Sequence, residues 1–147
     1  MAWTALTTPQ ERYRRAGRYI SGPMVDTEKI YKGDLVRINA DGEWTSSGAP
    51  AAGDMFAGIA IETVDNTVDG HNIEVDTKGI FQLTLASAAQ ADVGTLVYGG
   101  ASDAANDQQS VYSSAGTHSL LIGAVVGLGN IANSVRVKIL PLRYVSA

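Results

Sequence analysis

The sequence IEVDTKGIFQLTL, residues 73–85, decides the fold class, because its apolar and polar side chains alternate on both sides of a Lys-Gly turn. A period of two is the pattern of a strand with one buried face, since successive side chains of a strand point to opposite sides. We therefore predict two strands here, with Glu74 and Asp76 directed toward solvent. The side chains predicted to point inward are Ile73, Val75, Phe81, Leu83 and Leu85.

Shorter strand signals continue on both sides of this stretch. Asp41-Gly42 is typical of a hairpin turn, and residues 118–127 are the continuous apolar run that a fully buried strand would show. Residues 55–64 alternate imperfectly around small residues, which suggests a bulge or a close approach of two backbones. Residues 86–93 favour one helical turn at most. Further strands are expected within residues 30–39, 43–45, 55–64, 95–98, 111–112, 118–127 and 135–139.

This spacing predicts an all-β fold, a small β-barrel or sandwich of about eight or nine short strands. A chain of 147 residues, 45% hydrophobic and 18% charged, suits one domain with a real core. It contains no cysteine, which excludes disulfides and thiolate metal sites. The sequence holds neither an apolar run long enough to span a membrane nor an apolar segment typical of a secretion signal.

The first 24 residues differ from the rest of the chain. Pro9 and the Gly22-Pro23 pair bracket them as breakers, and no apolar stripe would dock them on the body. We predict an N-terminal arm at 1–24, which orders on a partner, and a β-barrel or sandwich body at 25–147. The candidate binding residues of the arm are four arginines with interleaved tyrosines, namely Arg12, Tyr13, Arg14, Arg15, Arg18 and Tyr19.

The charge distribution separates the ends of the chain from its middle. Residues 1–37 hold seven basic and four acidic residues, net +3, and residues 38–135 hold one basic and eleven acidic residues, net −10. Residues 136–147 add three basic residues, net +3. Opposed patches of this kind can orient a molecule on a charged partner. The alternative is a solvated acidic surface with chance asymmetry.

Two motifs resemble binding loops. Asp65-Asn66-Thr67-Val68-Asp69-Gly70 starts like a calcium loop, but such a loop needs a flanking helix on each side and the residues after it predict a strand. Gly127-Leu128-Gly129-Asn130-Ile131-Ala132 mimics a dinucleotide turn, but another strand follows it. Turns between strands explain both motifs better, so we expect neither a metal nor a cofactor.

Few residues of the sequence are suited to catalysis. His71 and His118 are the two side chains suited to near-neutral acid–base chemistry, and no serine lies in a Gly-x-Ser-x-Gly motif. Trp44 and Tyr98 are the main aromatic candidates for a sugar-binding cleft. We therefore expect a protein without enzymatic activity. The arginines of the arm suit carboxylates as well as phosphates, and the acidic body favours a protein partner over nucleic acid.

Several short motifs occur in a familiar order over residues 30–140, namely KGDLV (32–36), AGIA (57–60), EVDTKGIF (74–81), GTLVY (94–98), IGAVV (122–126) and VRVKI (135–139). In these motifs the chain resembles the small capsid decoration, or head cement, proteins of tailed phages, of the lambda type. Its arm is rich in arginine, whereas the arms of the lambda type are rich in Thr and Pro.

The resemblance implies a structural protein on the outside of a virion, assembled in the host cytoplasm. Its partner would be the major capsid protein, contacted partly through the arm, and the chain would self-associate as a homotrimer or a dimer. The alternative from another class is a particle-displayed module that binds host-surface glycans through loops 46–54 and 99–110. A hydrolytic enzyme and a self-associating protein unrelated to viruses are further hypotheses.

Overall fold

The computed structural model describes Thr8 and residues 17–48, 50–68, 70–99, 110–115 and 120–142. The fold is all-β, as the alternation predicted, with two five-stranded sheets and one two-stranded ribbon, arranged as in a sandwich and not closed into a barrel. The named strands pair in antiparallel fashion, and two isolated bridges, Met24 with Trp44 and Leu85 with Val111, are parallel. No helix in the described ranges is long and apolar enough to cross a membrane.

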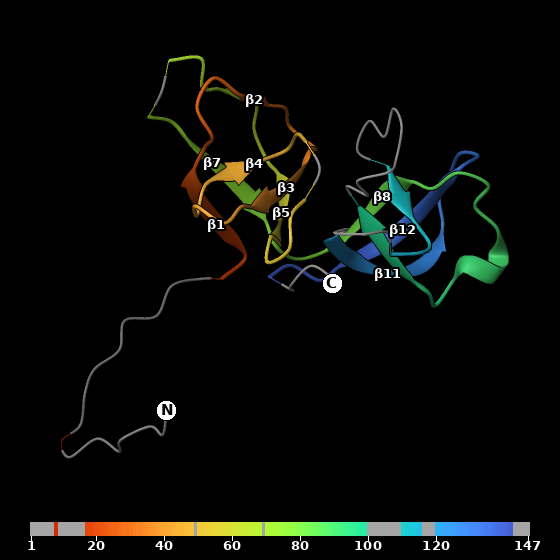
Figure 1. Cartoon of the computed structure of the whole chain (residues 1–147). Helices are drawn as coiled ribbons and strands as arrows, with labels where there is room; N and C mark the ends of the chain where they lie inside the picture. The colour runs from red at the N-terminus through yellow and green to blue at the C-terminus, as the bar shows by residue number, and fades with distance from the viewer. Residues whose placement is uncertain are drawn as a thin grey trace.

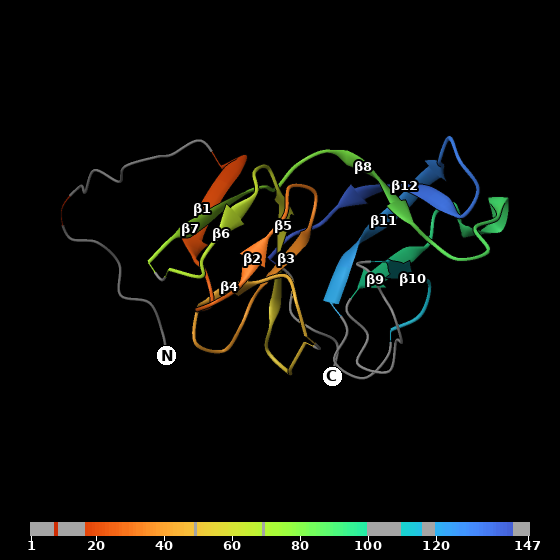
Figure 2. The ribbon, with the colours of Figure 1, turned by 90° about the horizontal axis from the view of Figure 1, so that it is seen from above.

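The two large sheets define two lobes that lie side by side in Figures 1 and 2. The first lobe, residues 17–77, holds a sheet in the order β1 (Tyr19–Pro23), β7 (Asn72–Asp76), β5 (Met55–Ala60), β3 (Leu35–Ile38) and β4 (Trp44–Thr45), with the ribbon β2 (Lys29–Ile30) and β6 (Val64–Asp65). The second lobe, residues 78–142, holds a sheet in the order β10 (Val111–Tyr112), β9 (Leu96–Gly99), β11 (Leu120–Leu128), β12 (Ser134–Ile139) and β8 (Ile80–Thr84).

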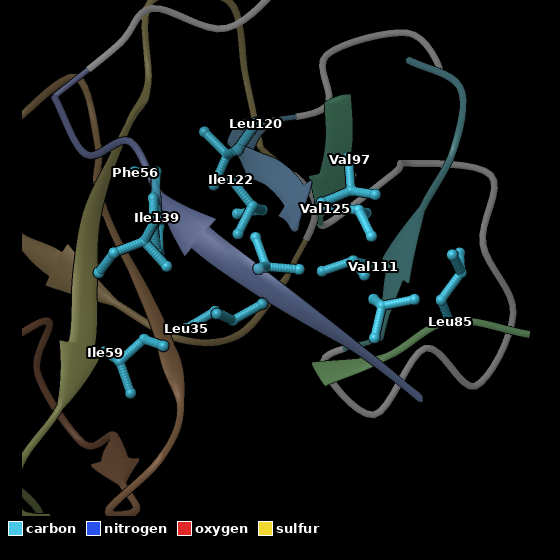
Figure 3. Packing of buried hydrophobic residues seen from close by; sticks show 12 residues of the cluster. Leu35, Phe56, Ile59, Leu85, Val97, Val111, Leu120, Ile122, Val125 and Ile139 are labelled. Carbon is cyan, nitrogen blue, oxygen red and sulfur yellow. The ribbon is translucent and has the colours of Figure 1, made fainter. Parts of the chain in front are cut away.

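Two hydrophobic cores hold these elements together. One core lies within the first lobe, around the fully buried side chains of Ile30, Ile73 and Val75. The other joins the lobes, because Leu35 and Phe56 of the first sheet pack against the second lobe, as Figure 3 shows. The first sheet therefore buries both faces. Members of the joint core are Leu35, Phe56, Ile59, Leu85, Val97, Val111, Leu120, Ile122, Val125, Val135, Val137 and Ile139.

The backbone after β12 also links the lobes. Leu140 donates its amide to the carbonyl of Ile122 at 2.8 Å, and Leu142 donates to the carbonyl of Phe56 in β5 at 2.7 Å. The chain thus returns to the first lobe at Leu142, and the lobes share both a core and the main-chain hydrogen bond from Leu142 to Phe56.

The imperfect alternation of residues 55–64 has a structural cause. The pairing of β3 and β5 shifts register between Val36 and Arg37, opposite Gly58. Gly58 has φ +150°, and a Cβ there would collide with the carbonyl oxygen of Asp76. The bulge and the close backbone approach predicted from the sequence are therefore confirmed.

Other local predictions are confirmed as well. Asp41-Gly42 turns between β3 and β4, where Asn39 and Glu43 are joined by a backbone hydrogen bond of 2.9 Å. The helical turn expected within residues 86–93 is the 3-10 helix η1 (Gln90–Asp92). Residues 129–133 connect β11 to β12, which confirms that the glycine-rich motif is a turn between strands.

The structure corrects three expectations. Twelve strands are found in the described residues, because β1, β2 and β6 add to the nine predicted positions. The strand predicted over 118–127 is not fully buried, since Val126 in β11 is 47% exposed. Asp76 is buried rather than directed to solvent, with 7% of its surface exposed, because its carboxylate forms an ion pair with Arg18.

The boundary placed at residue 24 also falls inside the first lobe. Residues 19–23 form β1, which pairs with β7 over five positions from Tyr19 with Asp76 to Pro23 with Asn72. Gly22 is buried in this strand, and a Cβ there would collide with the indole of Trp44. The segment that precedes the sheet is therefore residues 1–18.

Candidate functional site at the root of the N-terminal segment

The candidate site is the edge of the first sheet where the basic N-terminal segment enters it. β1 is an outer strand with β7 as its neighbour in the sheet, and directly after it Met24 forms an isolated bridge with Trp44 of β4. Figure 2 places β1 on the side of the first lobe that is turned away from the second lobe. A short outer strand presents backbone groups that another chain can pair with.

The hydrogen-bond pattern shows which backbone groups face the open edge. Thr77 donates its amide to the carbonyl of Arg18 at 2.8 Å, and Met24 donates to the carbonyl of His71 at 3.1 Å. In an antiparallel ladder every second residue of a strand bonds to the neighbour, and the residues between them point their N–H and C=O groups away. Tyr19 and Ser21 therefore direct both backbone groups toward the open edge.

Arg18 anchors the root of the arm to the end of β7. Its Nη2 lies 3.1 Å from Oδ2 of Asp76, and its Nε donates to Oδ1 at 3.3 Å, a two-point arrangement suited to a guanidinium and a carboxylate. The guanidinium carbon also lies 5.0 Å from the centre of the Tyr19 ring, within cation–π range. The chain therefore leaves the sheet from a fixed position.

Thr77 also secures this root. Its hydroxyl lies 2.9 Å from the carbonyl oxygen of Gly17 and 2.6 Å from that of Arg18, and it donates toward both. The residue lies directly after β7, at the passage from the first lobe to the second. The root of the arm is thus fixed next to the connection between the lobes.

The ion pair perturbs the Asp76 carboxyl. The hydrogen bond from Arg18 holds the pKa of Asp76 below its usual range, against the opposing effect of desolvation, and the Lys78 amide lowers it further at 3.1 Å. A carboxyl whose pKa is lower in the folded state stabilises the fold fully above its unfolded pKa, near 4, and loses that contribution as pH falls through the folded pKa.

We therefore expect acid to weaken the root of the arm. Unfolding free energies measured between about pH 6 and pH 2 should fall less steeply for Asp76→Asn than for the unsubstituted chain. Asp41→Asn, at the exposed turn after β3, is the matched control and should keep the original pH dependence. Equal slopes for the Asp76→Asn variant and the unsubstituted chain would contradict the assignment of this ion pair.

The structure places some of the predicted arm residues and not others. Arg18 and Tyr19 lie together at the root, whereas Arg12, Tyr13, Arg14 and Arg15 lie outside the described residues. Alternation along β7 could not have revealed the partner of Arg18, because the two residues are 58 positions apart and the alternation directs Asp76 toward solvent.

The other candidate groups serve local structure where they are described. Asp65, the first residue of the calcium-like motif, accepts the amide of Thr67 at 3.0 Å in a turn between β6 and β7. His71 is exposed, with its amide bonded to Asn66, while His118 and Asp69 lie outside the described residues. No cluster of three or more potential metal ligands is found in the described part of the chain.

Side chains from outside loop 46–54 hold it in place, a feature that the sequence did not reveal. Arg37 of β3 pairs with Asp54 through Nε and Oδ2 at 3.1 Å and donates from Nη1 to the carbonyl of Gly48 at 3.1 Å. At the start of the loop, Glu28 accepts the amide of Ser46 at 2.8 Å.

Comparisons of the chain with protein-family models, with curated proteins and with solved structures found no match.

Proposed function

We propose that the chain binds the outer surface of a tailed-phage capsid and stabilises it, with residues 1–18 as the arm that contacts the major capsid protein. The observation that carries the proposal is the junction of a basic segment with an open strand edge. The resemblance of residues 30–140 to capsid decoration proteins agrees with this role. The homotrimer and the position on the virion exterior are part of the same proposal.

A fixed root supports binding by an arm. Arg18 and Thr77 hold the start of β1, so the arm leaves the lobe from a defined point and less freedom is lost when it binds. Extended segments commonly bind by adding a strand to a sheet, where main-chain hydrogen bonds give the affinity. Tyr19 and Ser21 would continue that pairing onto the body of the protein.

Charge supports an acidic partner for the arm. Residues 1–16 hold three basic residues and one acidic residue, net +2, whereas residues 17–77 hold four basic and eleven acidic residues, net −7. A carboxylate-bearing capsid surface would attract the arginines of the arm and repel much of the first lobe. The contact would therefore be made by the arm and its root. Many copies on one particle would each contribute modestly and together stabilise the shell.

Deletion of residues 2–16 tests the arm. We expect this variant to co-sediment with heads that lack the chain at least about 100-fold less well, because simultaneous engagement multiplies weak contacts. The deletion leaves Gly17, Arg18 and all of β1 in place, whereas a deletion as far as residue 21 would also remove three residues of a sheet strand.

A charge variant of full length complements the deletion. The variant replaces three arginines by glutamate, Arg12, Arg14 and Arg15, and keeps the length of the arm. It should weaken binding to the heads, as the deletion does. Lys32→Glu, on the exposed surface of the first lobe, is the control and should leave binding unchanged. Identical thermal unfolding of all variants would show that the body is intact. Binding that survives the deletion would refute the role of the arm.

A further inference from the structure

β8 differs from the other strands that border the two large sheets. β4 and β10 have two residues each, and β1 carries Pro23, which has no amide hydrogen to donate. β8 has five residues, IFQLT, with neither a proline nor a charged side chain. Proteins normally keep edge strands short, guard them with proline or charge, or cover them, because an unguarded edge pairs with other chains. β8 is therefore suited to pair with a partner strand.

The hydrogen bonds of β8 show which of its backbone groups face outward. In the described part of the chain, β12 is the one strand that pairs with β8, and Ile139 after this pairing donates its amide to the carbonyl of Gly79 at 3.2 Å. Bonded residues alternate in an antiparallel ladder, so Ile80 and Gln82 direct their N–H and C=O groups away from β12. The edge ends at Leu85, which forms the isolated bridge to β10.

The inner side of this edge is apolar and incompletely covered. Phe81 and Leu83 pack against the joint core but are half-buried. Their partners in β12, Val137 and Val135, are fully buried. The joint core therefore ends at β8. A strand added beside β8 would place every second side chain next to Phe81 and Leu83, and apolar side chains at these positions would extend the core.

The outer side of the same edge is basic. Lys138 and Arg136 of β12 lie one strand away from the edge, opposite Ile80 and Gln82, and Lys78 precedes the turn into β8. All three basic side chains are exposed, and neither lysine has a carboxylate partner among the described residues. The five strands of this sheet contain no acidic residue. An added strand would lie about 10 Å from β12, within the combined reach of a lysine and a glutamate.

We infer that the open edge of β8 binds an extended, acidic segment of a partner protein, which joins the second sheet as a further strand. Apolar residues of the segment cover Phe81 and Leu83, and the aspartates or glutamates that alternate with them face Lys138 and Arg136. Main-chain hydrogen bonds give the affinity in strand addition, and the alternating side chains give the specificity. The arm of a second copy does not fit this chemistry, because residues 1–16 have net charge +2. The inference is independent of capsid binding.

A synthetic peptide and the purified full-length chain test the inference. The probe is a heptapeptide with capped ends that alternates Val and Glu. When it is added, the backbone amides of Ile80 and Gln82 should shift in NMR spectra and exchange with solvent at least about 10-fold more slowly, because they gain hydrogen-bond partners. A peptide with Lys in place of Glu should bind at least about 10-fold more weakly, because like charges repel.

Two further comparisons separate strand addition from charge attraction alone. A Val–Glu peptide with methylated backbone nitrogens keeps its charge but donates no main-chain hydrogen bonds, so it should bind at least about 10-fold more weakly. Lys138→Glu should weaken binding of the unmethylated peptide at least about 10-fold, whereas Lys138→Arg and the control Lys32→Glu on the first lobe should retain it. No binding at about 1 mM peptide, or equal binding by the methylated peptide or by Lys138→Glu, would overturn the inference.

Discussion

Arg37→Ala is expected to lower the free energy of unfolding by about 3–5 kcal/mol, because it leaves a buried carboxylate without its cation. The Arg37 and Asp54 side chains are 12% and 3% exposed, and their charged atoms lie 3.1 Å apart. Oδ2 of Asp54 also accepts the amide of Ala51 at 3.0 Å, whereas Oδ1 is buried and has no hydrogen-bond partner. Loss of the guanidinium would therefore leave the Asp54 carboxylate with a single neutral donor.

Arg18→Ala is the matched comparison for this prediction. Its ion pair with Asp76 has the same N···O distance of 3.1 Å, but 56% of the Arg18 side chain is exposed. Water and salt screen exposed pairs, so this substitution should cost a small fraction of the Arg37→Ala effect. Urea unfolding of both variants gives the two free energies. Equal losses would contradict the explanation by burial.

Asn66→Ala should lower the free energy of unfolding by about 2–4 kcal/mol, because the buried backbone groups that bond to the Asn66 side chain would lose their hydrogen bonds. Asn66 is fully buried. Its Nδ2 donates to the carbonyl of Val25 at 3.0 Å, and its Oδ1 accepts the amide of His71 at 2.9 Å. These bonds join the segment after β1 to the segment before β7, so their loss would loosen both connections.

The control for this prediction is Asn130→Ala in the turn after β11. The Asn130 side chain is exposed, and the hydrogen bond to Gln82 is made by the backbone amide of Asn130, which an alanine retains. Thermal and urea unfolding should give values close to those of the unsubstituted chain. If Asn66→Ala lowers the free energy of unfolding no more than Asn130→Ala does, the Asn66 side chain does not hold these two segments together.

The parts of the fold that were predictable are those specified by neighbouring residues. The alternation in residues 73–85 placed β7 and β8, and Asp41-Gly42 placed the hairpin between β3 and β4. Side-chain period and turn chemistry both act over a few positions, so a single sequence contains the information. The all-β class followed from repeated signals of this kind.

The parts that were missed depend on residues far apart in the chain. β1 contains Ser21-Gly22-Pro23, which carries no alternation, and it becomes a strand because β7 supplies the hydrogen bonds. The anchor of the arm was hidden for the same reason, since Arg18 and Asp76 are 58 positions apart. Tertiary contacts therefore decided both the end of the arm and the burial of Asp76.

The central claim is that this chain strengthens a phage capsid. It is tested most directly by the thermal stability of tailed-phage heads that are assembled without the chain. Adding the purified chain should raise the temperature at which these heads release their DNA, with saturation at a fixed number of copies per head. An unchanged release temperature with no chain bound to the heads would contradict the account.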